Sequence, residues 1–197
     1  MTLQDIANIC WNNRVTISFG NVPSWPKPDT VFLKARFKIN APNLWVMGKD
    51  RPGWYWFETD VRVVSLTTLV KPGNLPKSAR DFGYVSKSNV ALFDGEICQK
   101  KSNIDVVYNG HDANVLSRIR AHFLGINGNG ALGIQYYSLS NNHWSVSLFH
   151  RDMVEEMNCL SPEEKKHISD FCRSHTGRIA IEGAWRSIYG WPVLCKA

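Results

Sequence analysis

The segment 30–39 alternates between apolar and other side chains. Its odd positions are apolar from Val31 to Ile39, and basic residues stand at Lys34, Arg36 and Lys38. Successive side chains of a β-strand point to opposite faces of its sheet, and no helical period fits this pattern. The pattern therefore predicts a strand with one apolar and one cationic face.

Patterns along the rest of the chain predict further elements. Alternation favours strands over 14–19, 60–70, 103–108, 131–139, 143–149 and 178–182, a closing strand within 184–196, and a hairpin over 89–98 around Asp94-Gly95. Apolar residues at helical spacing, with capping residues, predict a short helix from Thr2 and two main helices over 112–124 and 161–173. The expected fold class is α+β, β-rich, with a mostly antiparallel sheet or sandwich of about eight strands and two main helices.

A chain of 197 residues fits one globular domain. Its expected parts are an N-terminal helix, strand and proline-rich connector (1–29), a basic β-rich half (30–110) and a mixed α/β half (111–197). Three prolines within 23–28 prevent regular hydrogen bonding around Trp25, so the segment 22–28 is either a plain surface loop or a docking site for a protein partner. A homo-oligomer is also compatible with the sequence.

Four aromatic residues follow one another from Trp54 to Phe57. In a strand they would make both faces aromatic. The preferred interpretation is that one face is buried and the other covered, and the alternative is an exposed platform for bases or a lipid interface.

The net charge of +6 is concentrated in the middle of the chain. Residues 27–101 contain 13 Lys/Arg and 7 Asp/Glu, a difference of +6, and the two flanks are balanced. Such an excess favours nucleic acid or an anionic membrane surface as the partner. The candidate anion-binding residues are Lys34, Arg36, Lys38, Lys49, Arg51, Lys71, Lys77 and Arg80, and the candidate aromatic contacts are Trp25, Trp45, Trp54 and Tyr55.

Catalytic and metal motifs are weak. Cys10, His143 and Asp152 follow the order of nucleophile, base and orienting group in papain-like proteases, which makes a Cys/His hydrolase one alternative function. Zinc-ligand types occur at Cys159, His167, Cys172 and His175, but residues 167 and 172 would point about 140° apart on a helix. Arg118 and His122 share one face of the helix over 112–124, which is interpreted as a solvated polar face. No cofactor is expected.

Cysteine usage and targeting signals indicate the compartment. The five cysteines are odd in number and lack Cys-x-x-Cys spacing, which favours free thiols in a reducing environment. Neither a signal peptide nor an apolar run of about 20 residues is visible. The expected location is intracellular, either cytoplasmic or nuclear.

From residue 103 onward, the expected order of elements resembles that of rhabdovirus matrix proteins. The order is a strand, the helix over 112–124, paired strands, the capped helix over 161–173 and a closing strand with Gly183-Ala184-Trp185. The resemblance implies a non-enzymatic viral structural protein that bridges a nucleocapsid and a membrane, and no functional residue is carried over from it.

The charge and this resemblance together predict a non-catalytic basic protein that binds nucleic acid, RNA included, or an anionic membrane. A viral structural or accessory protein would fit this expectation. The Cys/His hydrolase and a protein–protein interaction scaffold remain the alternatives.

Overall fold

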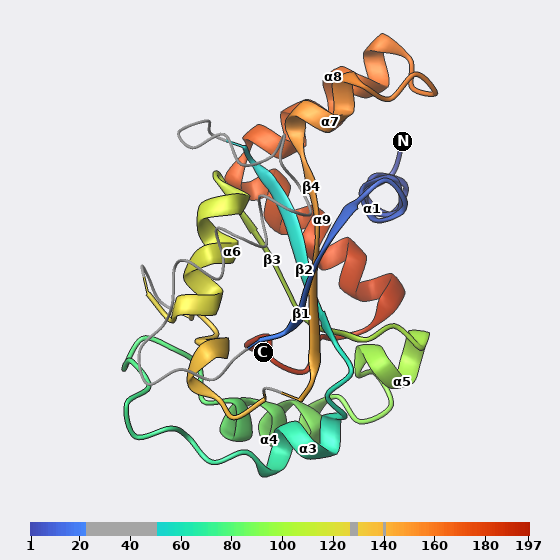
Figure 1. Cartoon of the computed structure of the whole chain (residues 1–197). Helices are drawn as coiled ribbons and strands as arrows, with labels where there is room; N and C mark the ends of the chain where they lie inside the picture. The colour runs from blue at the N-terminus through green and yellow to red at the C-terminus, as the bar shows by residue number, and fades with distance from the viewer. Residues whose placement is uncertain (23–50, 127–129, 140) are drawn as a thin grey trace.

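Four antiparallel strands form the centre of the fold in the computed structural model, which describes residues 1–22, 51–126, 130–139 and 141–197. They are β1 (Val15–Asn21), β2 (Gly53–Thr59), β3 (Val106–Asp112) and β4 (His143–His150), in the order β1-β4-β2-β3. β2 and β4 are therefore the inner strands, and β1 and β3 are the edges (Figure 1). Strands from all three expected parts of the chain thus join one sheet.

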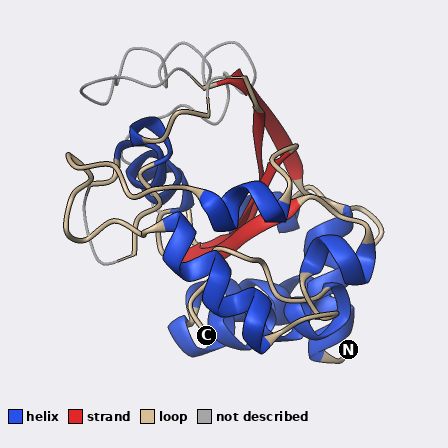
Figure 2. Cartoon of the chain, turned by 90° about the horizontal axis from the view of Figure 1, so that it is seen from below, coloured by secondary structure: helices blue, strands red, loops and turns tan. Residues whose placement is uncertain are grey.

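Helices cover both faces of this sheet (Figures 1 and 2). The core on one face contains residues of α3 (Val63–Thr68), α4 (Phe82–Leu92), α6 (Val115–Leu124) and the 3-10 helix η2 (Ile134–Tyr136). The core on the other face contains residues of α1 (Leu3–Asn12), α5 (Cys98–Ser102), α7 (Arg151–Glu155), α8 (Pro162–Arg173) and α9 (His175–Tyr189). The sheet is therefore the middle layer between two hydrophobic cores.

The four aromatic residues of β2 belong to these two cores. Tyr55 and Phe57 pack in the core that contains α6, whereas Trp54 and Trp56 pack in the core that contains α9. All four side chains are buried, with at most 2% of their surface exposed. The prediction that both faces are covered is confirmed, and Trp54 is not an exposed contact for bases or lipid.

Local capping signals predicted three helices well. α1 and α8 begin with capping boxes at Thr2/Asp5 and Ser161/Glu164, in which each side chain bonds the other residue's backbone N–H. α6 ends at Gly125, whose φ of 66° is the left-handed conformation that glycine adopts without strain. The cap at its start is Asn114, so α6 begins later than the expected helix over 112–124.

The prediction of a β-rich fold with about eight strands and two main helices is wrong. The described residues form four strands and eight α-helices. Of the expected strands, 60–70 contains α3, 131–139 contains η2, and the expected hairpin over 89–98 is the end of α4 followed by a turn. Short apolar runs such as 63–69 carry too few residues to separate a helical period from a strand period.

α9 replaces both strands that were expected near the C-terminus. Its buried and half-buried apolar residues Ile181, Ala184, Trp185 and Ile188 recur every three or four positions, which is the helical period. Gly183-Ala184-Trp185 therefore lies within a helix and not within a closing strand. Over the five residues 178–182, alternating side chains imitate a strand, although the pattern over the whole segment is helical.

The C-terminal segment 191–196 runs beside the edge strand β3. Leu194 N–H donates to the Val107 carbonyl at 2.8 Å, and Asn109 N–H donates to Cys195 Sγ at 3.4 Å. Asn89, on α4, donates from Nδ2 to the carbonyls of Val193 and Cys195 at 2.9 and 2.5 Å. These bonds fix the backbone of the segment against the edge of the sheet.

Some predictions fall outside the described residues. These are the strand over 30–39 with Lys34, Arg36 and Lys38, the candidates Lys49, Trp25 and Trp45, and the docking segment 22–28 apart from Val22. Within the described ranges, each helix is too short or too polar to cross a membrane.

Candidate functional site

A polar pocket of about 260 Å³ lies at the edge of the sheet beside β3. Side chains reach it from both faces, because Tyr55 and Arg118 come from the α6 side and Glu182 and Arg186 come from α9. The C-terminal segment contributes the last residues of the lining. The full lining is Tyr55, Arg80, Tyr108, Asn109, Gly110, His111, Arg118, Glu182, Arg186, Cys195 and Lys196.

Gly110 lets the Tyr55 side chain cross β3 toward this pocket. Tyr55 on β2 pairs with Gly110 on β3. A Cβ at position 110 would lie 2.5 Å from the Tyr55 hydroxyl oxygen and 2.8 Å from Cζ, far inside contact distance. The absent side chain is therefore the space that the tyrosine hydroxyl occupies.

His122 fixes the orientation of the Tyr55 hydroxyl. The backbone N–H of Leu132 donates to His122 Nδ1 at 3.2 Å, so Nδ1 is the acceptor and the neutral ring carries its proton on Nε2. Nε2 lies 2.9 Å from the Tyr55 hydroxyl oxygen and donates to it. Burial, with Arg118 and Arg80 nearby, lowers the pKa of His122 well below 6.5 and keeps the ring neutral.

Arg118 adds a second donor to the same oxygen. Burial raises the pKa of Tyr55 well above 10, and a hydrogen bond from Arg118 opposes this rise. The Tyr55 oxygen thus accepts from both His122 and Arg118, so its own hydrogen points elsewhere. Tyr55 and Tyr108 stack with ring centroids 6.2 Å apart, and together they form one wall of the pocket.

Glu182 is the acidic residue of the pocket lining. Arg186 holds it through an ion pair within α9, and Arg186 Nε also donates to Asn109 Oδ1 at 2.9 Å. The Arg186 guanidinium lies 4.5 Å from the centre of the Trp191 ring, which fixes it from the other side. Burial raises the pKa of Glu182, against the opposing effect of Arg186 and Arg80.

His111 supplies a neutral imidazole to the pocket. Burial, then the charges of Arg178 and His175, lowers the pKa of His111 to about 4. Its Nε2 lies 3.7 Å from Glu182 Oε2, and its buried Nδ1 has no hydrogen-bond partner among the described residues. At neutral pH this ring is therefore unprotonated and able to accept a proton.

The pocket carries a strong positive excess. Four cations line it, Arg80, Arg118, Arg186 and Lys196, against the single carboxylate of Glu182, a difference of +3. An anion with oxygen acceptors matches this lining, because guanidinium groups bind phosphate and carboxylate oxygens through paired hydrogen bonds.

Of the predicted anion-binding residues that are described, only Arg80 lines the pocket. Arg51 is buried and lies 3.7 Å from Asp152, so it serves an internal ion pair. Lys71 and Lys77 are exposed on the loop before Arg80. Among the predicted aromatic contacts, Tyr55 lines the pocket and Trp54 donates its indole N–H to the Arg178 carbonyl inside the core.

The cysteine-protease arrangement is wrong. Cys10 is fully buried in α1, where burial raises its pKa well above 9. His143 is the first residue of β4, whereas Asp152 lies in α7, after the other end of this strand. The His143 side chain bonds Ser18 at 3.0 Å instead. A thiolate nucleophile activated by an imidazole cannot form from residues placed in this way.

The structure also keeps the four predicted zinc ligands apart. Cys159 is exposed, Cys172 is buried in the core, His167 packs on Phe171, and His175 packs on His111. Within the described part of the chain, no group of three or more His, Cys, Asp or Glu side chains is arranged to hold a metal ion.

Sequence reasoning missed most of the pocket. Arg118 and His122 were interpreted as a solvated face, yet His122 is fully buried and Arg118 lines the pocket. Their spacing of four residues, directly after a strand that carries Tyr108 and His111, was the available signal. Glu182 gave no signal, because its segment was expected to be a strand.

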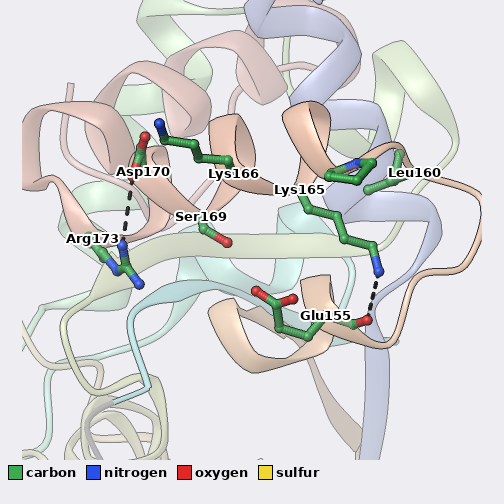
Figure 3. Close-up of a pocket in the computed structure, with 8 residues that line it drawn as sticks. Glu155, Leu160, Lys165, Lys166, Ser169, Asp170 and Arg173 are labelled. Atoms are coloured by element: carbon green, nitrogen blue, oxygen red, sulfur yellow. Dashed lines mark hydrogen bonds and ion pairs between the residues drawn. The ribbon is translucent and has the colours of Figure 1, made fainter.

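A second hollow lies between α7 and α8 (Figure 3). Ser169 points into it, and two of the charged side chains that line it have partners in its wall. Lys165 Nζ donates to the Glu155 carbonyl at 2.8 Å, and Arg173 lies 3.8 Å from Asp170. This hollow lacks the unbalanced charge of the pocket beside β3.

Comparisons of the chain with protein-family models, with curated proteins and with solved structures find no match. The resemblance to rhabdovirus matrix proteins therefore stays a prediction.

Proposed function

We propose that this protein cleaves phosphodiester bonds of nucleic acid in the pocket beside β3. The observation that carries this proposal is the convergence of Glu182, Arg118 and the oriented Tyr55 hydroxyl on one cationic pocket. The proposal keeps nucleic acid as the expected partner. It replaces the expectation of a non-catalytic protein, because the pocket combines anion-binding groups with groups that can move a proton.

Phosphate fits the pocket better than a flat membrane surface does. The cations surround a recess of about 260 Å³ instead of spreading over an open face. Arg118 lines this recess beside the Tyr55 hydroxyl, and a guanidinium binds phosphate oxygens through its planar fork of N–H donors. Arg118 is therefore assigned to bind the phosphate and to stabilise the charge that grows on it during cleavage.

Glu182 holds the neighbouring groups of the pocket in place. It forms an ion pair with Arg186, and its Oε2 lies 3.7 Å from His111 Nε2. Because the carboxylate is engaged in this way and four cations line the pocket, Glu182 is assigned to position His111 and not to bind a metal ion.

His111 and Tyr55 take the proton-handling roles. The unprotonated His111 ring lies beside Glu182 and is assigned as the acceptor of the proton from the attacking water. As the water attacks the phosphorus, the P–O ester bond breaks and the leaving oxygen takes a proton from the Tyr55 O–H, which points away from its two donors His122 and Arg118. His122 acts through Tyr55 and is a positioning residue.

A cleavage assay tests this proposal. End-labelled single- and double-stranded DNA and RNA are incubated with the protein in Mg²⁺, in Mn²⁺ and in EDTA. We expect cleavage of at least one of these substrates, in EDTA as well as with metal, and a loss of about tenfold or more in the Glu182→Gln variant, because His111 loses the carboxylate that positions it. Glu163→Gln, an exposed glutamate at the start of α8, is the control and should retain full activity.

Two results would contradict the proposal. One is that none of the four nucleic acids is cleaved under any of these conditions. The other is that Glu182→Gln cleaves as fast as the unchanged protein, which would place any nuclease activity outside this pocket.

A further inference from the structure

The hollow between α7 and α8 contains a buried hydroxyl group, that of Ser169. This residue is 6% exposed, and its Oγ has no hydrogen-bond partner among the described residues. Buried polar groups are almost always hydrogen-bonded, and a helical serine can bond a carbonyl of the preceding turn. Ser169 points into the hollow instead (Figure 3). A hydroxyl held in this way marks a place where a bound molecule would complete its hydrogen bonding.

The hollow has the size of a small-molecule site. Its volume is about 450 Å³, within the roughly 300–1,000 Å³ that is typical of ligand pockets. Leu160 and Pro162 give it an apolar side, and the rest of its lining is charged apart from Ser169. A ligand with both an apolar and a charged part therefore fits this lining.

Unlike the pocket beside β3, the hollow carries both signs of charge in near balance. Three basic and two acidic residues line it, a difference of +1. The two carboxylates would repel a phosphodiester, and a simple anion would leave them without a partner. A ligand with one positive and one negative group matches both signs.

Arg173 can receive the negative group of such a ligand. It follows Ser169 by four residues on the same face of α8, which is about 6 Å along the helix axis. Its guanidinium lies 3.8 Å from Asp170, too far for a hydrogen bond, and both side chains are more than half exposed. An exposed ion pair of this kind is weak. A ligand carboxylate can therefore bind the guanidinium through paired hydrogen bonds, with the Ser169 hydroxyl beside it.

Glu155 can receive the positive group. It is the last residue of α7, and its carboxylate extends toward Ser169 across the hollow (Figure 3). Among the described residues this carboxylate makes no hydrogen bond and no ion pair. The backbone carbonyl of Glu155 accepts from Lys165 Nζ at 2.8 Å, which ties the end of α7 to α8. The acidic group is thus held at the wall while its charge remains available to a ligand.

We propose that this hollow binds a zwitterion, either an amino acid or a short peptide with free ends. The ammonium group of the ligand binds Glu155, and its carboxylate binds Arg173 beside Ser169. An aliphatic side chain of the ligand packs against Leu160 and Pro162. The inference goes beyond the proposed function and does not depend on it, because the hollow and the pocket beside β3 share no lining residue.

Isothermal titration calorimetry with four small molecules tests the site. Leucine and the dipeptide leucyl-leucine carry both charges, whereas 4-methylpentanoate lacks the amine and 3-methylbutylamine lacks the carboxylate. We expect at least one of the two zwitterions to bind about tenfold or more tightly than both analogues, because each analogue leaves one charged group of the hollow without a partner. Tighter binding of leucine would assign the site to free amino acids, and tighter binding of the dipeptide would assign it to peptides.

Three variants locate the binding. Ser169→Ala should weaken binding of the preferred zwitterion by about threefold or more, yet the melting temperature of the free protein should not fall, because the change removes an unpartnered buried hydroxyl. Glu155→Gln should lower the affinity for this zwitterion to that of 4-methylpentanoate. Glu163→Gln, an exposed glutamate of α8 outside the lining, is the control and should bind as the unchanged protein does.

Equal affinities of the zwitterions and the analogues would overturn the proposal, and so would the absence of binding by both zwitterions at millimolar concentration. Unchanged binding in Ser169→Ala, or an equal loss in Glu155→Gln and Glu163→Gln, would also overturn it. Because the readout involves no nucleic acid, this result and the cleavage assay can fail independently of each other.

Discussion

Gly110→Ala should inactivate the protein by displacing a tyrosine hydroxyl. The new Cβ would lie 2.5 Å from the Tyr55 oxygen, whereas ordinary contact begins at 3.4 Å, so the two atoms must separate by about 0.9 Å (3.4 − 2.5). Such a shift breaks or bends the 2.9 Å bond to His122. A misplacement of about 1 Å costs on the order of 10²-fold in rate.

The same substitution should lower the free energy of unfolding by about 1–3 kcal/mol, because Tyr55 and His122 are buried and would lose their hydrogen bond. Cleavage rates and urea unfolding curves measure the two effects. Gly73→Ala is the matched control, because its added Cβ would have no neighbour within 4 Å. It should change neither quantity appreciably.

A double variant separates the role of the hydroxyl from a general disturbance of β3. If Gly110→Ala acts through Tyr55, then adding it to Tyr55→Phe should lower the rate by no more than a few-fold beyond Tyr55→Phe alone. Full activity in Gly110→Ala would refute the reasoning, and so would losses that multiply in the double variant.

Three other predictions follow from the pocket and the core. Arg118→Lys should slow cleavage by at least about tenfold, because the ammonium cannot bind phosphate and Tyr55 with the planar fork, and an unchanged kcat/KM would disprove this role. The pKa of His111 is about 4, so the acid limb of the rate profile should lie below about pH 5 and should vanish in His111→Gln; a limb that survives this change belongs to another group. The pKa of His150 is also about 4, with burial first and Arg51 second as its causes, against about 6.5 when unfolded. The unfolded state therefore binds the proton first, and stability should be complete above pH 6.5 and fall by up to roughly 3 kcal/mol as the pH drops toward 4. Chemical denaturation across this range should show a shallower fall for His150→Phe, and equal slopes would contradict the assignment.

Elements with local signals could be predicted from the sequence. Capping boxes predicted α1 and α8, and alternating residues predicted β1 and β4. α3 and α4 were missed because their apolar residues form short runs, and the turn at Asp94-Gly95 imitates a hairpin. Their helical state depends on packing against the sheet, which local patterns do not record.

The pocket could be predicted even less well, because it is assembled from distant parts of the chain. Tyr55, Arg118 and Glu182 meet only after β2, α6 and α9 have packed around the edge strand. The need for a glycine at position 110 becomes visible only once the structure pairs it with Tyr55. The i, i+4 spacing of Arg118 and His122 was visible, but a polar helical face is usually solvated, and nothing local showed that this one is buried.

The most direct test of the proposed site is a crystal structure of the Tyr55→Phe variant with a short oligonucleotide. The account predicts one phosphate in the pocket, within hydrogen-bond distance of Arg118 and beside His111. An oligonucleotide bound elsewhere on the surface, with no phosphate in the pocket beside β3, would contradict it.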